Sequence, residues 1–207
     1  MFDKQLVVVY TVWYILKYDV SAGFNPARLK GVSMDERMVQ IPEFEWSRIG
    51  DIDEGRKHLG NTLPVAVYRL MQFTVFDTLQ AHYGTEKAQE AFRQAGHSAG
   101  VAFAKNNLNL KAEFDAFVAE LQNVLKTLAI GILRIERSNA DKTKLVLTVS
   151  EDLDCSGLPV VGETVCHYDE GFLAGVLKAY TGAEYEVIEI DCWASGDRTC
   201  RFSADRV

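Results

Sequence analysis

The sequence has few prolines and no block of basic residues, and both absences narrow what the chain can be. Only 4 of its 207 residues are proline and a quarter are charged, a composition that argues against wholesale disorder. The 22 basic residues are outnumbered by 29 acidic ones, which gives a net charge of −7. Because proteins meet the nucleic-acid backbone with clustered Lys and Arg, we expect no direct nucleic-acid binding.

The N-terminal apolar run, residues 6–16, is too short to cross a bilayer. It also lacks the basic start and the small-residue cleavage site of a secretion signal. We therefore expect no membrane span, a cytoplasmic location and reduced thiols. The β-branched and aromatic content of residues 1–18 favours a buried strand over a short helix.

Motifs of the common enzyme classes are missing as well. The sequence contains no glycine-rich phosphate loop, Rossmann fingerprint, Gly-x-Ser-x-Gly elbow or His-Glu-x-x-His pair. Cys166 and His167 are adjacent, so on a helix their side chains diverge by about 100° and cannot form a nucleophile–base pair. The sequence therefore favours a binding protein over an enzyme.

The pattern of elements predicts an α+β fold with an antiparallel sheet packed with helices. Glycine-rich residues 19–62 predict a loop-rich lead-in with a strand at 44–49, and residues 1–62 could serve dimerisation. A helix from Pro64 to Gly84 is apolar on several faces, which predicts burial nearly all round. Two more helices begin at Thr85 and near Asn109. The remaining predicted elements are strands at 130–137 and 144–150 joined as a hairpin, a helix at 163–180, and strands at 184–190 and 201–203.

Small residues recur every four positions on two of these helices. Gly96, Gly100 and Ala104 share one face of the second helix, although each glycine costs about 1 kcal/mol against alanine in a helix. Close approach of another backbone or of a ligand explains such a face, and we favour tight helix–helix packing. Gly171 and Gly175 form a second small face, which could pack on the sheet or on a helix across a dimer.

All four cysteines lie in the last third of the chain, between residues 155 and 200. In a cytosolic protein, clustered thiols favour a metal over disulfides, and burial as small apolar groups is the alternative. The predicted hairpin returns Cys200 to the side of Cys192, and Cys166 lies in the first turn of a helix. Cys155 or Glu189 could supply a fourth ligand. Strand alternation turns Glu189 away from Cys192, so Glu189 needs a bulge or a strand end.

The Cys…Glu-x-x-Cys…Cys spacing resembles that of the 4-vinyl reductase domain family, with the best match over residues 125–205. This family includes the sensory domains of phenol- and xylene-responsive transcriptional activators and bacteriochlorophyll 4-vinyl-reductase-like proteins. The resemblance implies a zinc clamp near the C-terminus, held by Cys166, Glu189, Cys192 and Cys200, with Cys155 as the alternative ligand. It also implies a ligand-binding domain at residues 63–207 and a homodimer.

The resemblance further implies a small-molecule pocket beside the zinc. Lys126 and Val149 stand where the phenol sensors carry a histidine and a tryptophan, so phenol specificity is not expected. Phe172 and Val176 would line an apolar cavity or belong to the core, and His97 is a further candidate for ligand contact.

We therefore expect a zinc-stabilised sensor or carrier domain for an apolar or aromatic molecule. The alternative is a protein of tetrapyrrole metabolism, either a vinyl-reductase-like enzyme or a tetrapyrrole carrier or chaperone. A scaffold with a vestigial pocket is the third possibility. The sequence shows no ATPase module or helix-turn-helix, so a sensor would need a partner for its output.

Overall fold

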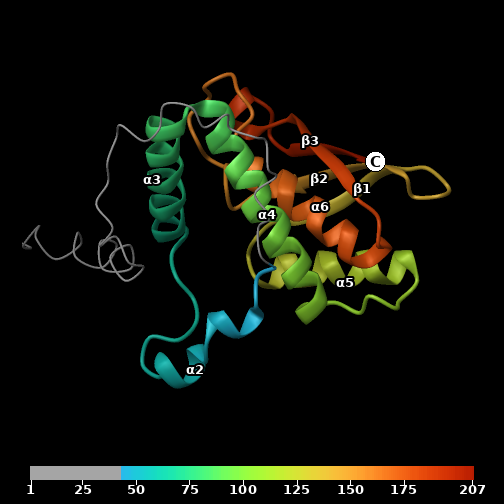
Figure 1. Ribbon diagram of the computed structural model, residues 1–207, viewed down its shortest axis with the longest axis horizontal. Coiled ribbons are helices and arrows are strands. Elements are labelled where there is room, and N and C mark those ends of the chain that lie inside the picture. The colour runs from blue at the N-terminus through green and yellow to red at the C-terminus, as the bar shows by residue number, and fades with distance from the viewer. Residues whose placement is uncertain (1–42) are drawn as a thin grey trace, which may run out of the picture. The chain divides into compact units, whose positions relative to one another are not determined.

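The computed structural model describes residues 43–207 (Figure 1). The strand predicted at residues 1–18 lies outside the described residues. The main helices are α3 (Val65–Tyr83), α4 (Thr85–Asn107), α5 (Phe114–Thr127) and α6 (His167–Thr181). The strands are β1 (Ile132–Ser138), β2 (Lys144–Ser150), β3 (Tyr185–Asp191) and β4 (Cys200–Arg206). Three short helical turns are η2 (Trp46–Ile49), α2 (Ile52–Gly55) and η3 (Trp193–Ser195).

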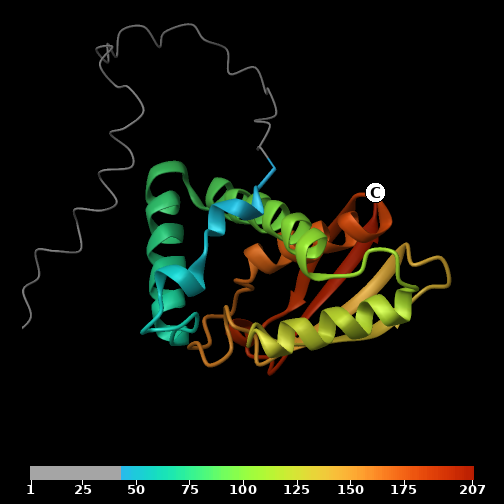
Figure 2. The ribbon, with the colours of Figure 1, turned by 90° about the horizontal axis from the view of Figure 1, so that it is seen from below.

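The four strands form one antiparallel sheet in the order β1-β2-β4-β3. Burial alternates along each of the inner strands, so that Leu145, Leu147 and Val149 of β2 are buried and their neighbours are not. The helices therefore cover one face of the sheet, with α5 packed on β1 and α6 packed on β3 (Figure 2). The predicted α+β class, the hairpin and the order of the elements are confirmed.

Helices α4 and α6 cross with their backbones in contact. A Cβ atom added at Gly96 would lie 2.0 Å from the carbonyl oxygen of Tyr168, and one added at Gly100 would lie 2.1 Å from that of Phe172. From the other side, Gly171 and Gly175 meet the backbone of α4 in the same way. The predicted helix–helix packing is thus confirmed, and the second small face packs on α4 of the same chain.

Three local predictions are wrong. Residues 46–49 form a 3₁₀ turn and not part of a strand, and the third helix begins at Phe114 instead of near Asn109. Helix α3 is not buried all round in the part of the chain that the structure describes, because Gln72 is its one buried residue. It packs against α4 at the edge of the helical layer (Figure 1), which leaves other faces of α3 exposed.

Strand β3 contains the irregularity that Glu189 requires. Its pairing with β4 shifts between Glu189 and Asp191, so Ile190 is an extra residue in the strand. Such a bulge reverses the alternation beyond it, and both Glu189 and Cys192 are buried. Within residues 43–207, no helix combines the length and the hydropathy that a membrane span needs. The boundary between residues 1–62 and 63–207 stays a prediction.

Candidate functional site

Four buried cysteine side chains converge beside the helix–sheet interface. Cys155 comes from the loop after β2, Cys166 is the N-cap of α6, Cys192 follows β3, and Cys200 begins β4. Their sulfur atoms all lie within 4.8 Å of one another. None of the four side chains is exposed, and all four are free thiols.

The spacing of these sulfurs suits a tetrahedral metal ion. Zinc–sulfur bonds of about 2.3 Å give sulfur–sulfur edges of about 3.8 Å in a tetrahedron. The Sγ atom of Cys166 lies 3.8 Å from those of Cys192 and Cys200, and the Cys155–Cys200 sulfur distance is 3.0 Å. An all-thiolate donor set is one that zinc prefers. The residues present therefore fit a zinc ion.

Close packing of the sulfurs also makes their ionisation interdependent. Hydrogen bonds from Cys155 and then from the other thiols lower the pKa of Cys192. The contact with Cys155 raises the pKa values of Cys166 and Cys200. Without a cation, the cluster thus stabilises a single thiolate at Cys192. A bound metal would favour the thiolate form of every ligand.

Glu189 lies beside the cysteine cluster and contacts it through the backbone. One carboxylate oxygen, Oε2, accepts a hydrogen bond from the Cys166 N–H at 3.0 Å. The other, Oε1, is buried and has no hydrogen-bond partner among residues 43–207. Burial raises the pKa of Glu189 to about 8. The four cysteines form the close group of potential ligand atoms, and Glu189 is outside that group.

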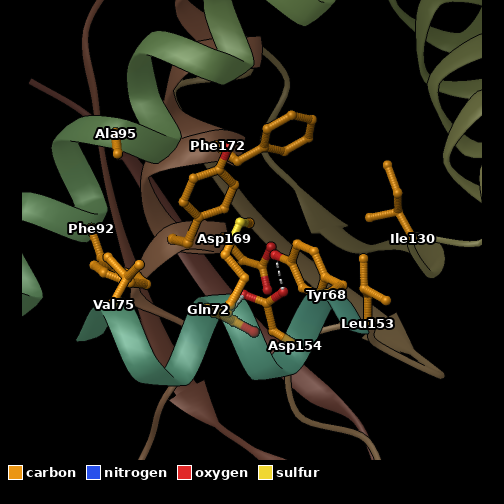
Figure 3. A pocket seen from close by; sticks show the side chains of 12 residues that line it. Tyr68, Gln72, Val75, Phe92, Ala95, Ile130, Leu153, Asp154, Asp169 and Phe172 are labelled. Atoms are coloured by element: carbon orange, nitrogen blue, oxygen red, sulfur yellow. Dashed lines mark hydrogen bonds between the residues drawn. The ribbon is translucent and has the colours of Figure 1, made fainter. Parts of the chain in front are cut away.

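A cavity of about 420 Å³ opens between α3, α4, α6 and the loop that follows β2. Its apolar wall is made of Met71, Val75, Phe92, Ala95, Ile130, Leu153 and Phe172. Figure 3 shows Val75 and Phe92 on one side of the cavity and Ile130 and Leu153 on the other. The volume is within the range of small-molecule sites, about 300–1,000 Å³.

A compact polar group interrupts this apolar lining (Figure 3). Tyr68 and Gln72 of α3 donate hydrogen bonds to the two oxygens of Asp154, at 2.8 and 2.6 Å. Asp169 of α6 also lines the cavity, with Tyr168 next to it. These contacts tie α3 to the loop that ends at Cys155.

Three carboxyl groups share this small region. A carboxylate oxygen of Asp152 lies within 4.8 Å of one from Asp169. Burial, followed by the charge of Asp154, raises the pKa of Asp152 to about 7. Burial and the charge of Asp152 hold the pKa of Asp169 well above its usual range. Close buried carboxyls favour sharing a proton over ionising together.

The predicted ligand-binding residues are spread over different places. Phe172 lines the cavity. Val149 and Val176 are buried in the hydrophobic core, and Lys126 is exposed on α5. His97 lies in a separate surface hollow, with its Nε2 atom 3.5 Å from Oε2 of Glu184. Their roles as ligand contacts stay predictions.

Sequence reasoning missed the polar group of the cavity. Tyr68 and Gln72 are separated from Asp154 by 86 and 82 positions, so no local spacing connects them. One signal was present, because Asp154 immediately precedes Cys155 and Asp169 follows Cys166 by three residues. An acidic residue in the first turn of a helix is ordinarily explained by the helix dipole, which hides a role such as that of Asp169.

The comparisons with known proteins agree with this fold. Residues 145–206 match the family model of the 4-vinyl reductase domain. Two uncharacterized proteins of Methanocaldococcus jannaschii are 29% and 24% identical to the chain over 146 and 144 residues. Each alignment covers 70% of this chain, and the two cover 80% and 76% of the relatives.

Two solved structures share the architecture. A vinyl-4-reductase family protein from Methanocaldococcus jannaschii superposes with a TM-score of 0.54 at 18% identity, covering 81% of this chain and 99% of that one. The phenol-responsive sensory domain of the transcription activator PoxR, solved with phenol, also gives 0.54, at 15% identity, covering 71% and 76%. At these identities the likeness shows the fold. Together with the match to the family model, it confirms the predicted resemblance to the 4-vinyl reductase domain family.

Proposed function

We propose that residues 63–207 form a zinc-stabilised domain that binds an apolar or aromatic small molecule, as a cytoplasmic sensor or carrier. The cavity between α3, α4 and α6 carries this proposal. Its volume of about 420 Å³ exceeds the roughly 150 Å³ of an engineered apolar cavity that binds benzene. An apolar lining with a few converging polar groups is typical of small-molecule sites.

The phenol-bound sensory domain supports an aromatic ligand. It has the same fold as this chain, and Phe92 and Phe172 offer aromatic surface to the cavity here. An aromatic ring gains stabilisation beyond its buried area when it packs edge-to-face or offset-stacked on such side chains.

We assign the zinc to Cys155, Cys166, Cys192 and Cys200, with Glu189 as the alternative to Cys155. Four protein ligands leave no open position, so the metal would be structural and would not bind substrate. It would join the loop after β2 to α6 and to the ends of β3 and β4.

The metal and the cavity are connected through the chain itself. Leu153 and Asp154, which line the cavity, immediately precede Cys155. Phe172 lines it from α6, whose N-cap is Cys166. Fixing the two cysteines therefore fixes two walls of the cavity.

Calorimetric titration with phenethyl alcohol tests ligand binding. We expect binding to the zinc-loaded wild type and its loss in Ala95→Trp, because the indole would project into the cavity that Ala95 lines. The matched control is Gln94→Trp, an exposed neighbouring position on α4 that does not line the cavity. Equal binding by both variants would place the ligand elsewhere.

Native mass spectrometry of metal-loaded protein tests the ligand set. We expect one zinc per chain in the wild type and in Glu189→Gln. Cys155→Ser should weaken zinc binding by more than about 100-fold, because loss of an outer partner alone costs 10- to 100-fold. The reverse result, with zinc lost from Glu189→Gln and kept by Cys155→Ser, would make Glu189 the fourth ligand.

A homodimer is the remaining part of the proposal. Helix α3 exposes Val67, Leu70 and Met71, which are 54%, 67% and 60% accessible within the described residues. Clustered exposed apolar side chains are typical of interaction surfaces. Light scattering after size exclusion measures the oligomeric state, and a monomer at micromolar concentration would contradict this part.

A further inference from the structure

The polar group in the cavity offers hydrogen-bond acceptors that have no donor. Gln72 Oε1 and Asp169 Oδ2 are both buried and lack a hydrogen-bond partner within residues 43–207. Both residues line the cavity. A buried acceptor without a donor is costly, so each is a position where a bound molecule would supply the missing hydrogen.

The geometry around Asp154 fixes which atoms are left over. The Gln72 side chain is only 9% exposed, and its amide nitrogen donates to Asp154 at 2.6 Å. Because that nitrogen is used, the amide oxygen is the free end of Gln72. The second oxygen of Asp154 is taken by the Tyr68 hydroxyl. The site is thus built to receive donors and not to offer them.

Charge points in the same direction. Asp154 and Asp169 line the cavity, with Asp152 close to Asp169, whereas no Lys, Arg or His lines it among the residues that the structure describes. Arg69 is nearby, but its guanidinium donates to the backbone carbonyls of Leu153, Asp152 and Ser156. The polar part of the cavity is therefore acidic.

We propose that the cavity selects an apolar amine, with the protonated amino group donating to Gln72 Oε1 and Asp169 Oδ2 and the apolar body packed against Phe92 and Phe172. This inference rests on the proposed ligand-binding function and narrows it to a ligand class. An ammonium group has three donors and no acceptor, and it forms charge-assisted hydrogen bonds with carboxylates. A neutral alcohol has a single donor, and a carboxylate would meet like charge.

Competitive calorimetry on the zinc-loaded wild type tests the selection with probes that share a benzyl group. Phenethylamine should bind about tenfold tighter than phenethyl alcohol, and phenylacetate should bind at least tenfold weaker than the alcohol. Phenethyltrimethylammonium, which keeps the charge but has no N–H donors, should bind at least tenfold weaker than the amine.

The outcomes separate this inference from the proposed function. If the alcohol binds in the cavity but the amine is not preferred, or phenylacetate binds as tightly, the inference is overturned and the proposed function stands. If none of the probes binds, both fail. Equal affinity of the trimethylated probe and the amine would overturn the role assigned to the two acceptors.

Asp169→Asn places the preference on a named residue. In the folded variant with its zinc content verified, affinity for phenethylamine should fall about tenfold, while affinity for phenethyl alcohol changes less than twofold. An unchanged preference for the amine would overturn the assignment of Asp169. The trimethylated probe keeps the test decisive if this variant does not fold.

Discussion

Replacing Gly100 with alanine is the sharpest test of how α4 and α6 are packed. The new Cβ would lie 2.1 Å from the carbonyl oxygen of Phe172 and 3.1 Å from its Cα. Even a close carbon–oxygen contact is about 3.3 Å, so the two backbones would have to separate by roughly 1 Å. Because the obstacle is backbone, no side-chain rotation relieves it.

The expected cost follows from two opposing effects. Overpacking costs about 1–3 kcal/mol and occasionally more, and a clash with backbone belongs at the upper end of that range. Alanine recovers about 1 kcal/mol of helix propensity. The net loss for Gly100→Ala should therefore be about 2 kcal/mol, measured as the free energy of unfolding in urea with far-ultraviolet circular dichroism.

Gly55→Ala is the matched control, because Gly55 is helical and has no atom within 4 Å of an added Cβ. Its stability should stay within about 1 kcal/mol of wild type. The double variant Gly100→Ala with Gly175→Ala should cost less than the sum of the single changes, since one separation of the helices relieves both clashes. A Gly100→Ala protein as stable as wild type would refute the close approach.

Three further predictions concern stability. Removing zinc with a chelator should lower the melting temperature and increase hydrogen exchange in the loop after β2 and the start of α6, because bound metal contributes directly to folding; an unchanged melting temperature would contradict a structural role. Arg93→Met should cost about 2 kcal/mol, because the Arg93 Nε donates at 2.6 Å to Glu170, whose side chain is only 4% exposed. Glu90→Gln, which alters only the outer 3.8 Å contact of Arg93, should cost less than about 0.5 kcal/mol, and equal costs in urea unfolding would show that the buried pair is unimportant. Phe202→Ala should cost about 3–5 kcal/mol because Phe202 is fully buried, whereas Ile188→Ala on the half-exposed face should stay within about 0.5 kcal/mol.

Local sequence patterns predicted much of the fold because they reflect local physics. The small-residue face at Gly96 and Gly100 predicted a close approach, and it was found against α6. The geometry of alternation required a bulge for Glu189 to face the side of Cys192, and the shift in pairing at Ile190 is such a bulge. Both arguments depend only on the repeat of a helix or a strand.

Features made by distant contacts were not predictable in this way. Helix α3 is apolar on several faces, and periodicity alone could not show that it packs at the edge and exposes Leu70 and Met71. The polar group of the cavity joins Gln72 to Asp154 and needs the fold before it exists. The choice between Cys155 and Glu189 likewise depended on where the loop after β2 carries Cys155.

A crystal structure of the zinc-loaded protein grown with phenethyl alcohol tests the central claim most directly, with the metal identified by anomalous scattering at the zinc edge. The account predicts one zinc about 2.3 Å from the sulfurs of Cys155, Cys166, Cys192 and Cys200. It also predicts the aromatic ring in the cavity beside Phe172. A cysteine cluster that takes up no metal, or a ring bound only outside this cavity, would contradict it.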